Sequence, residues 1–305
     1  MAAGEVKKSP NDIRLSSSLV VVNAKNEVLL VHRSPDSKAF AGVHVFPGGN
    51  FDKAQDESVQ MTAIRETFEE AGVLLASSSK SSTNVLSLEL DTARKAIHSQ
   101  KLPFASFLSQ NNLEADTASL LPFTQWITPV GPPRRFHAHF FVTFLPTAPH
   151  TGAESGDHRH SLPTPDGGLE VVSARFVHPL DALAEFAQGK IALMPPQFYI
   201  LTTLAPLLST RVHTREQRQQ VQRLSGSMFG RMVMNPRMLP PKEGEDRNGR
   251  AVLTYEGDEE RGGKPGRLHR SLVRMGKGGV PSEVVLLRNF DILTEVDWSP
   301  PSAKL

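Results

Sequence analysis

The first part of the chain carries short apolar runs separated by turn-forming residues. Two such runs lie within residues 18–32, on either side of Asn23-Ala24-Lys25-Asn26. This pattern is typical of a β-hairpin. Arg33 follows the second run directly, and a polar loop then leads to a third run at 43–46. An arginine at a strand end is either a surface charge or a contact for a phosphate group, so the hairpin alone leaves both roles open for Arg33.

Between residues 59 and 71 the apolar spacing changes to that of an amphipathic helix. The positions that follow the 3–4–3 spacing of a buried stripe are Met61, Ile64, Phe68 and Ala71. Because a helix turns by about 100° per residue, Glu66, Glu69 and Glu70 fall within one narrow arc on the opposite side. The pattern therefore predicts a helix with one face in the core and a cluster of carboxylates on the other.

The residues around this helix indicate where it begins and ends. Asp56 or Ser58 can cap its start, and Gly72 stands where a left-handed residue commonly ends a helix. Gly48 and Gly49 precede it. Glycines before a helix let a backbone carbonyl approach a metal and backbone amides approach a phosphate.

The rest of the chain predicts an α/β protein with two additions. Apolar residues recur at helical intervals over about 91–120, and this segment is expected to be a helical insertion. The next expected elements are strands at 136–145 and 170–176, helices from 179, 198 and 214, and short strands at 251–255, 271–273 and 284–288. We expect a flexible N-terminus at 1–14, a main domain at 15–210, a β-rich extension packed on it at 211–298, and an exposed tail at 299–305.

Composition narrows the function classes. The chain has 305 residues, 39% of them hydrophobic, and no cysteine, which excludes disulfides, zinc–thiolate sites and cysteine nucleophiles. A net charge of +2 does not favour an extended nucleic-acid-binding surface. The sequence contains no run of about 18 apolar residues, so it predicts no membrane span. Residues 1–14 lack the apolar segment of a secretory signal.

The three glutamates on one helix face can be interpreted either as a solvated acidic surface or as a metal-binding site. Like charges three and four residues apart each cost about 0.2–0.5 kcal/mol, a cost that a solvated acidic face can tolerate. Oxygen-only, charged ligand sets suit hard cations such as Mg²⁺ or Mn²⁺. The helix pattern alone does not decide between a solvated face and a metal site.

Residues 49–73 resemble the Nudix box. The positions that match in register are Glu57, Arg65, Glu66, Glu69, Glu70, Gly72 and Val73. Two positions depart from the box: Thr67 takes a place usually filled by an apolar residue, and Gly49 precedes Glu57 by eight residues rather than six. The resemblance implies a Nudix-type α/β/α sandwich with a mixed sheet over residues 15–210.

The same resemblance implies roles for individual residues. Metal binding falls to Glu66, Glu69, Glu70 and the Gly49 carbonyl; catalysis to Glu66, Glu70 and Arg65; and substrate binding to Gly48, Arg33, Arg134 and Arg135. In this scheme Arg65 orients the glutamates, and Glu57 and Gly72 are structural. Glu66 is the first candidate for the base, and Glu170 is a possible additional base or ligand by position alone.

Several features resemble the peroxisomal acyl-coenzyme A diphosphatase branch of this family and its fungal relatives. They are the insertion, the long box loop, the segment 126–129 followed by Arg134-Arg135, and the C-terminal Ala303-Lys304-Leu305, which is similar to a peroxisomal import signal. The resemblance implies hydrolysis of CoA or acyl-CoA to 3′,5′-ADP and (acyl-)4′-phosphopantetheine. It departs at His137, where the branch has an acidic residue.

Other functions remain open at this point. The alternatives are a diphosphatase for NADH, ADP-ribose or dinucleoside polyphosphates, an RNA-cap hydrolase, and a catalytically silent Nudix-fold binding module. The module would require lost glutamates, and all three are present. The tail predicts recognition by the peroxisomal import receptor and a peroxisomal location, with the cytoplasm as the alternative.

Overall fold

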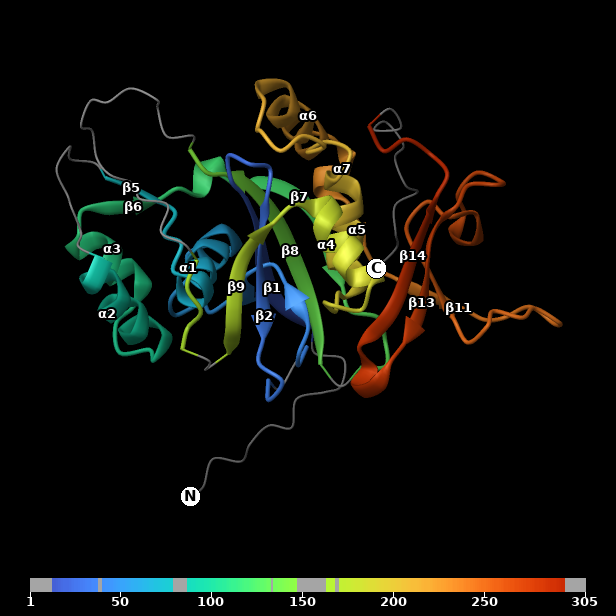
Figure 1. Ribbon diagram of the computed structural model, residues 1–305, viewed down its shortest axis with the longest axis horizontal. Coiled ribbons are helices and arrows are strands. Elements are labelled where there is room, and N and C mark those ends of the chain that lie inside the picture. The colour runs from blue at the N-terminus through green and yellow to red at the C-terminus, as the bar shows by residue number, and fades with distance from the viewer. Residues whose placement is uncertain are drawn as a thin grey trace, which may run out of the picture.

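The computed structural model describes residues 13–37, 40–78, 87–132, 134–146, 163–167 and 170–293. Its centre is an eight-stranded mixed sheet (Figure 1). The strands are β1 (Ile13–Val22), β2 (Val28–Arg33), β3 (His44–Val45), β4 (Gly48–Asn50), β7 (Leu121–Ile127), β8 (Arg135–Phe144), β9 (Val171–Val177) and β10 (Val233–Met234).

The sheet is built around β1. Its strand order is β10-β7-β8-β1-β2-β3, with β4 also paired to β1 and β9 to β2. β1 runs parallel to β8, from Ile13 beside Arg135 to Val22 beside Phe144, and antiparallel to β2 and β4. The expected hairpin at 18–32 is therefore β1 and β2, and the glycine pair lies on β4, against the middle of β1.

Helices cover both faces of the sheet. On one face lie α1 (Val59–Ala71), α2 (Ser87–His98) and α3 (Phe104–Gln110), where Phe68 stacks on Phe107 with ring centroids 5.6 Å apart. On the other lie α4 (Pro179–Ala187), α5 (Pro195–Leu204), α6 (Arg215–Gly226) and the short α7 (Met228–Arg231).

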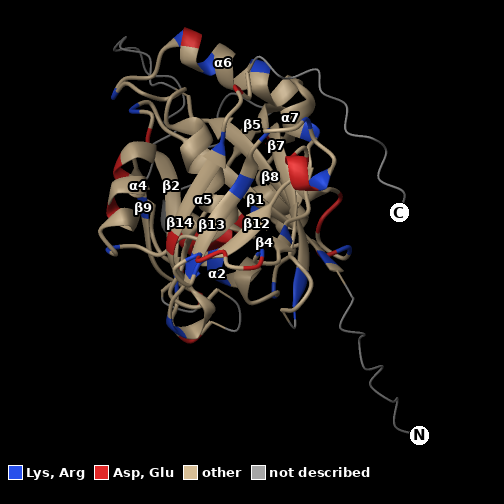
Figure 2. Cartoon of the chain, turned by 90° about the vertical axis from the view of Figure 1, so that its right-hand side faces the viewer, with Lys and Arg blue, Asp and Glu red and all other residues tan. Residues whose placement is uncertain are grey.

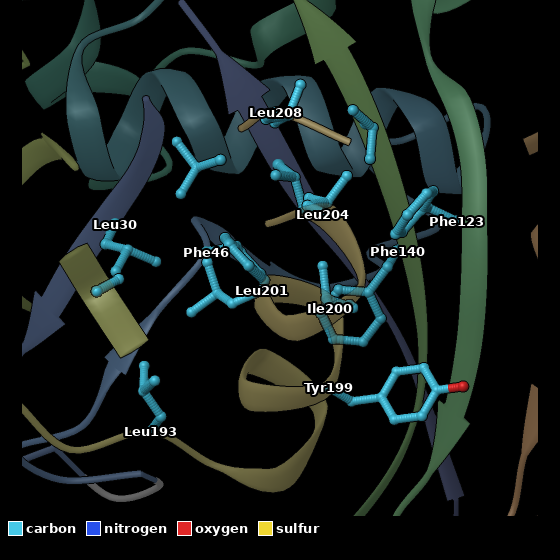
Figure 3. Close-up of a cluster of buried hydrophobic side chains, with 14 of the residues drawn as sticks. Leu30, Phe46, Phe123, Phe140, Leu193, Tyr199, Ile200, Leu201, Leu204 and Leu208 are labelled. Carbon is cyan, nitrogen blue, oxygen red and sulfur yellow. The ribbon is translucent and has the colours of Figure 1, made fainter. Parts of the chain in front are cut away.

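Alternate residues of the inner strands are buried in these two cores. Figure 3 shows Leu201 and Leu204 of α5 beside Leu30 and Phe140 of the sheet. This continuous burial on both faces explains why the strands read as apolar runs rather than as alternating patterns. The expected α/β/α sandwich with a mixed sheet is confirmed.

The insertion differs in part from the helical prediction for 91–120. α2 begins earlier, at Ser87, and the last helix ends at Gln110. Leu113 then lies on β6 (Leu113–Ala115), which pairs with β5 (Ala76–Ser78), and a 3₁₀ turn η1 (Thr117–Ser119) follows. Asn112 has a positive φ of 51°, which ends the helical run. The expectation that the insertion is helical to about residue 120 is wrong beyond Gln110.

The C-terminal residues form a second sheet of four antiparallel strands. They are β11 (Arg237–Leu239), β12 (Ala251–Thr254), β13 (His269–Met275) and β14 (Pro281–Arg288), with 3₁₀ turns η2 (Glu259–Arg261) and η3 (Lys277–Gly279) between them. This sheet packs on α5: the Tyr199 hydroxyl lies 2.8 Å from His269 Nε2, and the Tyr199 ring meets that of Tyr255. β10 also joins the main sheet beside β7, so residues 211–293 share a core with the main domain.

The distribution of charged residues and the character of the helices describe the protein further. In the view of Figure 2, basic and acidic residues are interspersed over the elements. Within the described ranges, none of the helices has the length and apolarity needed to cross a membrane. Of the flexible N-terminus expected at 1–14, residues 13 and 14 belong instead to β1, and residues 1–12 lie outside the described residues, as does the tail with Ala303-Lys304-Leu305.

Candidate active site

The helix α1 begins and ends as its sequence predicts. The Ser58 hydroxyl accepts a hydrogen bond of 3.2 Å from the Met61 amide and caps the start. At the other end Gly72 has a left-handed φ of 69°, and its N–H donates to the Phe68 carbonyl. A side chain at Gly72 would be strained in this conformation, so the box glycine stops the helix directly after the glutamates.

The carboxylate that ties the box loop to α1 is that of Asp56, not Glu57. Asp56 is buried and accepts bonds of 2.8 and 2.9 Å from Arg65 Nε and Nη2, and another of 2.9 Å from the Thr62 hydroxyl. Glu57 is exposed. A turn closed by two amide bonds to the Asp52 carbonyl places Asp56 under the helix. Asp56 makes these contacts, and the structural role that the resemblance implies for Glu57 stays a prediction.

Arg65 lies between the loop and the glutamates. While two of its nitrogens hold Asp56, Nη1 contacts Glu69 Oε1 at 2.8 Å and Glu66 Oε1 at 2.9 Å. A planar guanidinium can hold several carboxylates in fixed directions. Arg65 thus occupies the orienting position that the box resemblance implies.

The two glycines of β4 allow the strand to approach the helix closely. The Gly48 amide donates a bond of 2.9 Å to Glu70 Oε2. A Cβ on Gly49 would lie only 2.3–2.6 Å from the Glu66 carboxyl group. Any side chain at Gly49 would therefore displace Glu66.

Arg33 and Glu170 close the site from the sheet. Arg33 Nη1 lies 3.1 Å from Glu70 Oε1, and Nη2 lies 3.2 Å from Glu170 Oε2. The pairing of β2 with β9 is irregular between His32 and Arg33, where Arg33 meets Val171. Glu170, singled out by position alone, is thus brought to the same arginine as a box glutamate.

These residues line a cavity of about 330 Å³. The expected residues on its wall are Arg33, Gly48, Gly49, Arg65, Glu66, Glu69, Glu70 and Glu170, joined by Ile97, His98 and Gln100 at the end of α2. Its size lies within the usual range for small-molecule sites. The cavity is concave and rich in charge, and one helix supplies most of its carboxylates.

Arg134 and Arg135 do not line this cavity. Arg135 lies on β8 and pairs with Ile13 of β1, and β1 lies between β8 and β4. Arg135 Nε donates a hydrogen bond to the Thr128 carbonyl. Arg134 is exposed. The neighbouring His137 lies 2.7 Å from Gln125 and is likewise outside the cavity wall. The substrate-binding role expected for Arg134 and Arg135 stays a prediction, and it would act outside this cavity.

Burial raises the pKa values of two of the glutamates. Burial, together with the negative charges of Glu69 and Glu170, raises the pKa of Glu66 to about 7, against the opposing effect of Arg65. Burial, and next the charge of Glu66, raises the pKa of Glu70 well above its usual range, although Arg33 and the Gly48 amide oppose the shift. The site therefore concentrates negative charge that a cation would stabilise.

The donor atoms fit a hard divalent cation, because they are carboxylate oxygens close to a glycine-rich strand. The described side chains are nevertheless engaged with one another: among them, no group of three or more His, Asp or Glu converges as a metal centre. Arg33 and Gly48 hold Glu70, and Arg65 holds Glu66 and Glu69. Cation binding would thus require the Glu70 carboxylate to exchange partners.

Two residues of α2 reach the site without a sequence signal. His98 Nδ1 lies 3.3 Å from Glu69 Oε2, and Arg94 Nε donates to the Glu69 carbonyl at 2.8 Å. Hydrogen bonding to Glu69 raises the pKa of His98. Their spacing of four residues predicts that they share a face of α2, but not that this face meets α1.

A solved structure shares the fold. The Nudix hydrolase from Alicyclobacillus acidocaldarius superposes with a TM-score of 0.53 at 22% identity, over 68% of this chain and 96% of its own. The two proteins therefore share the fold of the Nudix hydrolases.

Residues 54–204 match the family model described as the NUDT19 Nudix domain. This match and the relatives below support a Nudix hydrolase of the branch that this domain represents. "Putative nudix hydrolase 7" of Caenorhabditis elegans is 27% identical over 197 residues, which cover 62% of this chain and 59% of the relative.

Two further relatives are both named "Acyl-coenzyme A diphosphatase NUDT19". The protein of Xenopus laevis is 25% identical over 238 residues (58% of this chain and 59% of the relative), and that of Homo sapiens is 26% identical over 242 residues (60% and 61%). The chain thus spans about three fifths of the length of these relatives.

Proposed function

We propose that this Nudix hydrolase cleaves the diphosphate of CoA or acyl-CoA and releases 3′,5′-ADP and (acyl-)4′-phosphopantetheine. The observation that carries the proposal is the convergence of five carboxylates and two arginines on one cavity beside Gly48 and Gly49. The substrate class rests on the printed name of the relatives from Xenopus laevis and Homo sapiens.

The carboxylates of Glu66, Glu69 and Glu70 and the carbonyl of Gly49 are the proposed ligands of Mg²⁺ or Mn²⁺. Such a cation neutralises diphosphate oxygens and lowers the pKa of a bound water. Arg65 keeps two of the carboxylates in place, since it contacts both and is itself anchored by Asp56.

Proton transfer in this site falls to a carboxylate. As the oxygen of water bonds to phosphorus and the bridging P–O bond breaks, the water proton passes to the base. Glu66 is the first candidate, because its raised pKa lies near neutral pH. Glu170 is the second, since its side chain is half exposed at the cavity edge. Interacting carboxylates titrate as a group, so the base is assigned to the pair.

Arg33 is the proposed contact for the diphosphate. Its two nitrogens already bridge Glu70 and Glu170, and a phosphate oxygen can replace either carboxylate as a bidentate partner. The Gly48 amide is a second donor at the same place. Arg134 and Arg135 lie off the cavity wall, so we restrict their proposed role to a part of the substrate, such as the 3′-phosphate, that extends beyond the cavity.

The proposed location is the peroxisome, reached through recognition of Ala303-Lys304-Leu305 by the import receptor. Only the tail sequence supports this proposal. Fusion of a fluorescent protein ahead of the last ten residues tests it: the fusion should enter peroxisomes, and deletion of Leu305 should leave it in the cytoplasm. Uniform cytoplasmic fluorescence of both fusion proteins would contradict the proposed peroxisomal location.

The substrate is tested by incubating purified protein and Mg²⁺ with CoA, an acyl-CoA, NADH and ADP-ribose in parallel, with products identified by mass. Preferential release of 3′,5′-ADP from the CoA compounds supports the proposal. Preferential cleavage of NADH or ADP-ribose would contradict CoA as the substrate and assign another nucleoside diphosphate compound in its place. Absence of any cleavage, with the substrates bound, would favour a binding module.

A further inference from the structure

Glu69 is held from α2 at both its backbone and its side chain. Arg94 Nε donates to its carbonyl at 2.8 Å, and His98 Nδ1 faces its Oε2 at 3.3 Å. The other carboxylate oxygen, Oε1, faces Arg65 at 2.8 Å. Each polar group of this glutamate that points away from its own helix thus has a fixed partner, and two of the three contacts come from the insertion.

Arg94 also connects α1 to the segment that leads to Glu170. Its Nη1 donates to the Thr164 hydroxyl at 2.9 Å and its Nη2 to the Thr164 carbonyl at 2.8 Å. The Thr164 amide in turn donates to the Ala71 carbonyl at the end of α1. Two residues further on, the Asp166 carboxylate accepts a bond of 2.8 Å from the Glu170 amide. One buried guanidinium therefore lies at the junction of the two acidic sides of the cavity.

The rest of α2 contributes to the same wall. Ile97 is buried in the core with α1, and His98 lies at the cavity surface with its side chain 20% exposed. Helix packing alone explains the buried Ile97. It does not explain why a polar imidazole faces a glutamate in the cavity, or why a charged guanidinium is buried against a backbone carbonyl, which is costly unless its donors are paired.

We propose that α2 is a positioning element of the active site. His98 fixes the direction of the Glu69 carboxylate, and Arg94 fixes its backbone together with the segment before Glu170. The inference rests on the proposed function, because it assigns Glu69 to cation binding. A glutamate side chain has several rotamers, and partners that hold a ligand in one of them are worth about 10–100-fold in metal affinity.

The test is Mn²⁺ binding to the full-length protein without substrate, measured by titration calorimetry. His98→Leu removes the imidazole contact and should weaken Mn²⁺ binding by about 10–100-fold. His98→Asn places an amide N–H near the position of Nδ1 and should recover most of that loss. Lys95→Leu, on the exposed side of the same helical turn, is the matched control and should bind as the wild type does.

Equal Mn²⁺ affinity of wild type and His98→Leu would overturn the positioning role. So would equally weak binding by His98→Asn and His98→Leu, because packing rather than the hydrogen bond would then matter. Absence of Mn²⁺ binding by the wild type has a different meaning: it would overturn the proposed metal chemistry itself, and the inference with it.

Arg94 is tested by hydrogen exchange. Arg94→Gln should accelerate exchange of the Glu170 and Val171 amides, which Asp166 holds, while Lys95→Leu leaves them unchanged. Unchanged protection of both amides in a folded Arg94→Gln protein would remove Arg94 from the proposal.

Discussion

Replacing Gly49 by alanine should lower activity by about 100-fold while leaving the fold intact. The added Cβ would lie 2.3 Å from the carboxyl carbon of Glu66, whereas ordinary contact begins at 3.4 Å. The carboxyl must therefore move by about 1 Å, and a displacement of that size in an active site costs about 100-fold in rate. Because the displaced atoms are the end of a flexible side chain, the free energy of unfolding should change little.

The assay compares kcat/KM for CoA hydrolysis and thermal unfolding in the same preparation. The matched control is Gly226→Ala, at the exposed end of α6, where a Cβ meets nothing within 4 Å. This control should keep full activity and gain at most about 0.4–1 kcal/mol in stability. Wild-type kcat/KM in Gly49→Ala would refute the reasoning that the glycine exists to admit Glu66.

Local features of the site could be predicted from sequence because they depend on neighbouring residues. Helical periodicity placed Glu66, Glu69 and Glu70 on one face, and capping preferences placed Ser58 and Gly72 at the ends of α1. All five positions depend on contacts within about four residues along the chain. This is why a single helix could be described well before its surroundings were known.

Long-range features could not be predicted in the same way. The choice of Asp56 over Glu57 depends on a turn at Asp52, and two adjacent acidic residues carry no signal of which one is buried. The resemblance implies a substrate-binding role for Arg134 and Arg135, which lie at the start of the strand predicted at 136–145. The sequence does not show that β1 lies between that strand and the glycine strand. The approach of α2 to Glu69 is likewise a property of packing.

Three further outcomes are expected. Asp56→Asn leaves Arg65 without its buried partner and should lower the free energy of unfolding in urea by about 3 kcal/mol, while exposed Glu57→Gln should stay within about 0.5 kcal/mol. Burial lowers the pKa of His269 to about 4, from 6.5 in the unfolded chain. Its neutral form therefore stabilises the fold above pH 6.5, and this contribution is lost as pH falls toward 4. Unfolding followed from pH 7 to 4 should show a shallower decline in His269→Gln. Because burial raises the pKa of Glu66 to about 7, Mn²⁺ affinity measured by calorimetry should rise as pH increases through 7; a flat profile from pH 6 to 8 would contradict this.

The central claim is that the buried carboxylates of α1 act with a divalent cation on a diphosphate. The most direct measurement is the Mg²⁺-dependent kcat/KM for CoA of Glu70→Gln beside Glu57→Gln, which makes the same change at an exposed box position. The account predicts a fall of about 10²–10³-fold for Glu70→Gln and wild-type activity for Glu57→Gln, with both proteins folded. Equal activity of the two variants would contradict it.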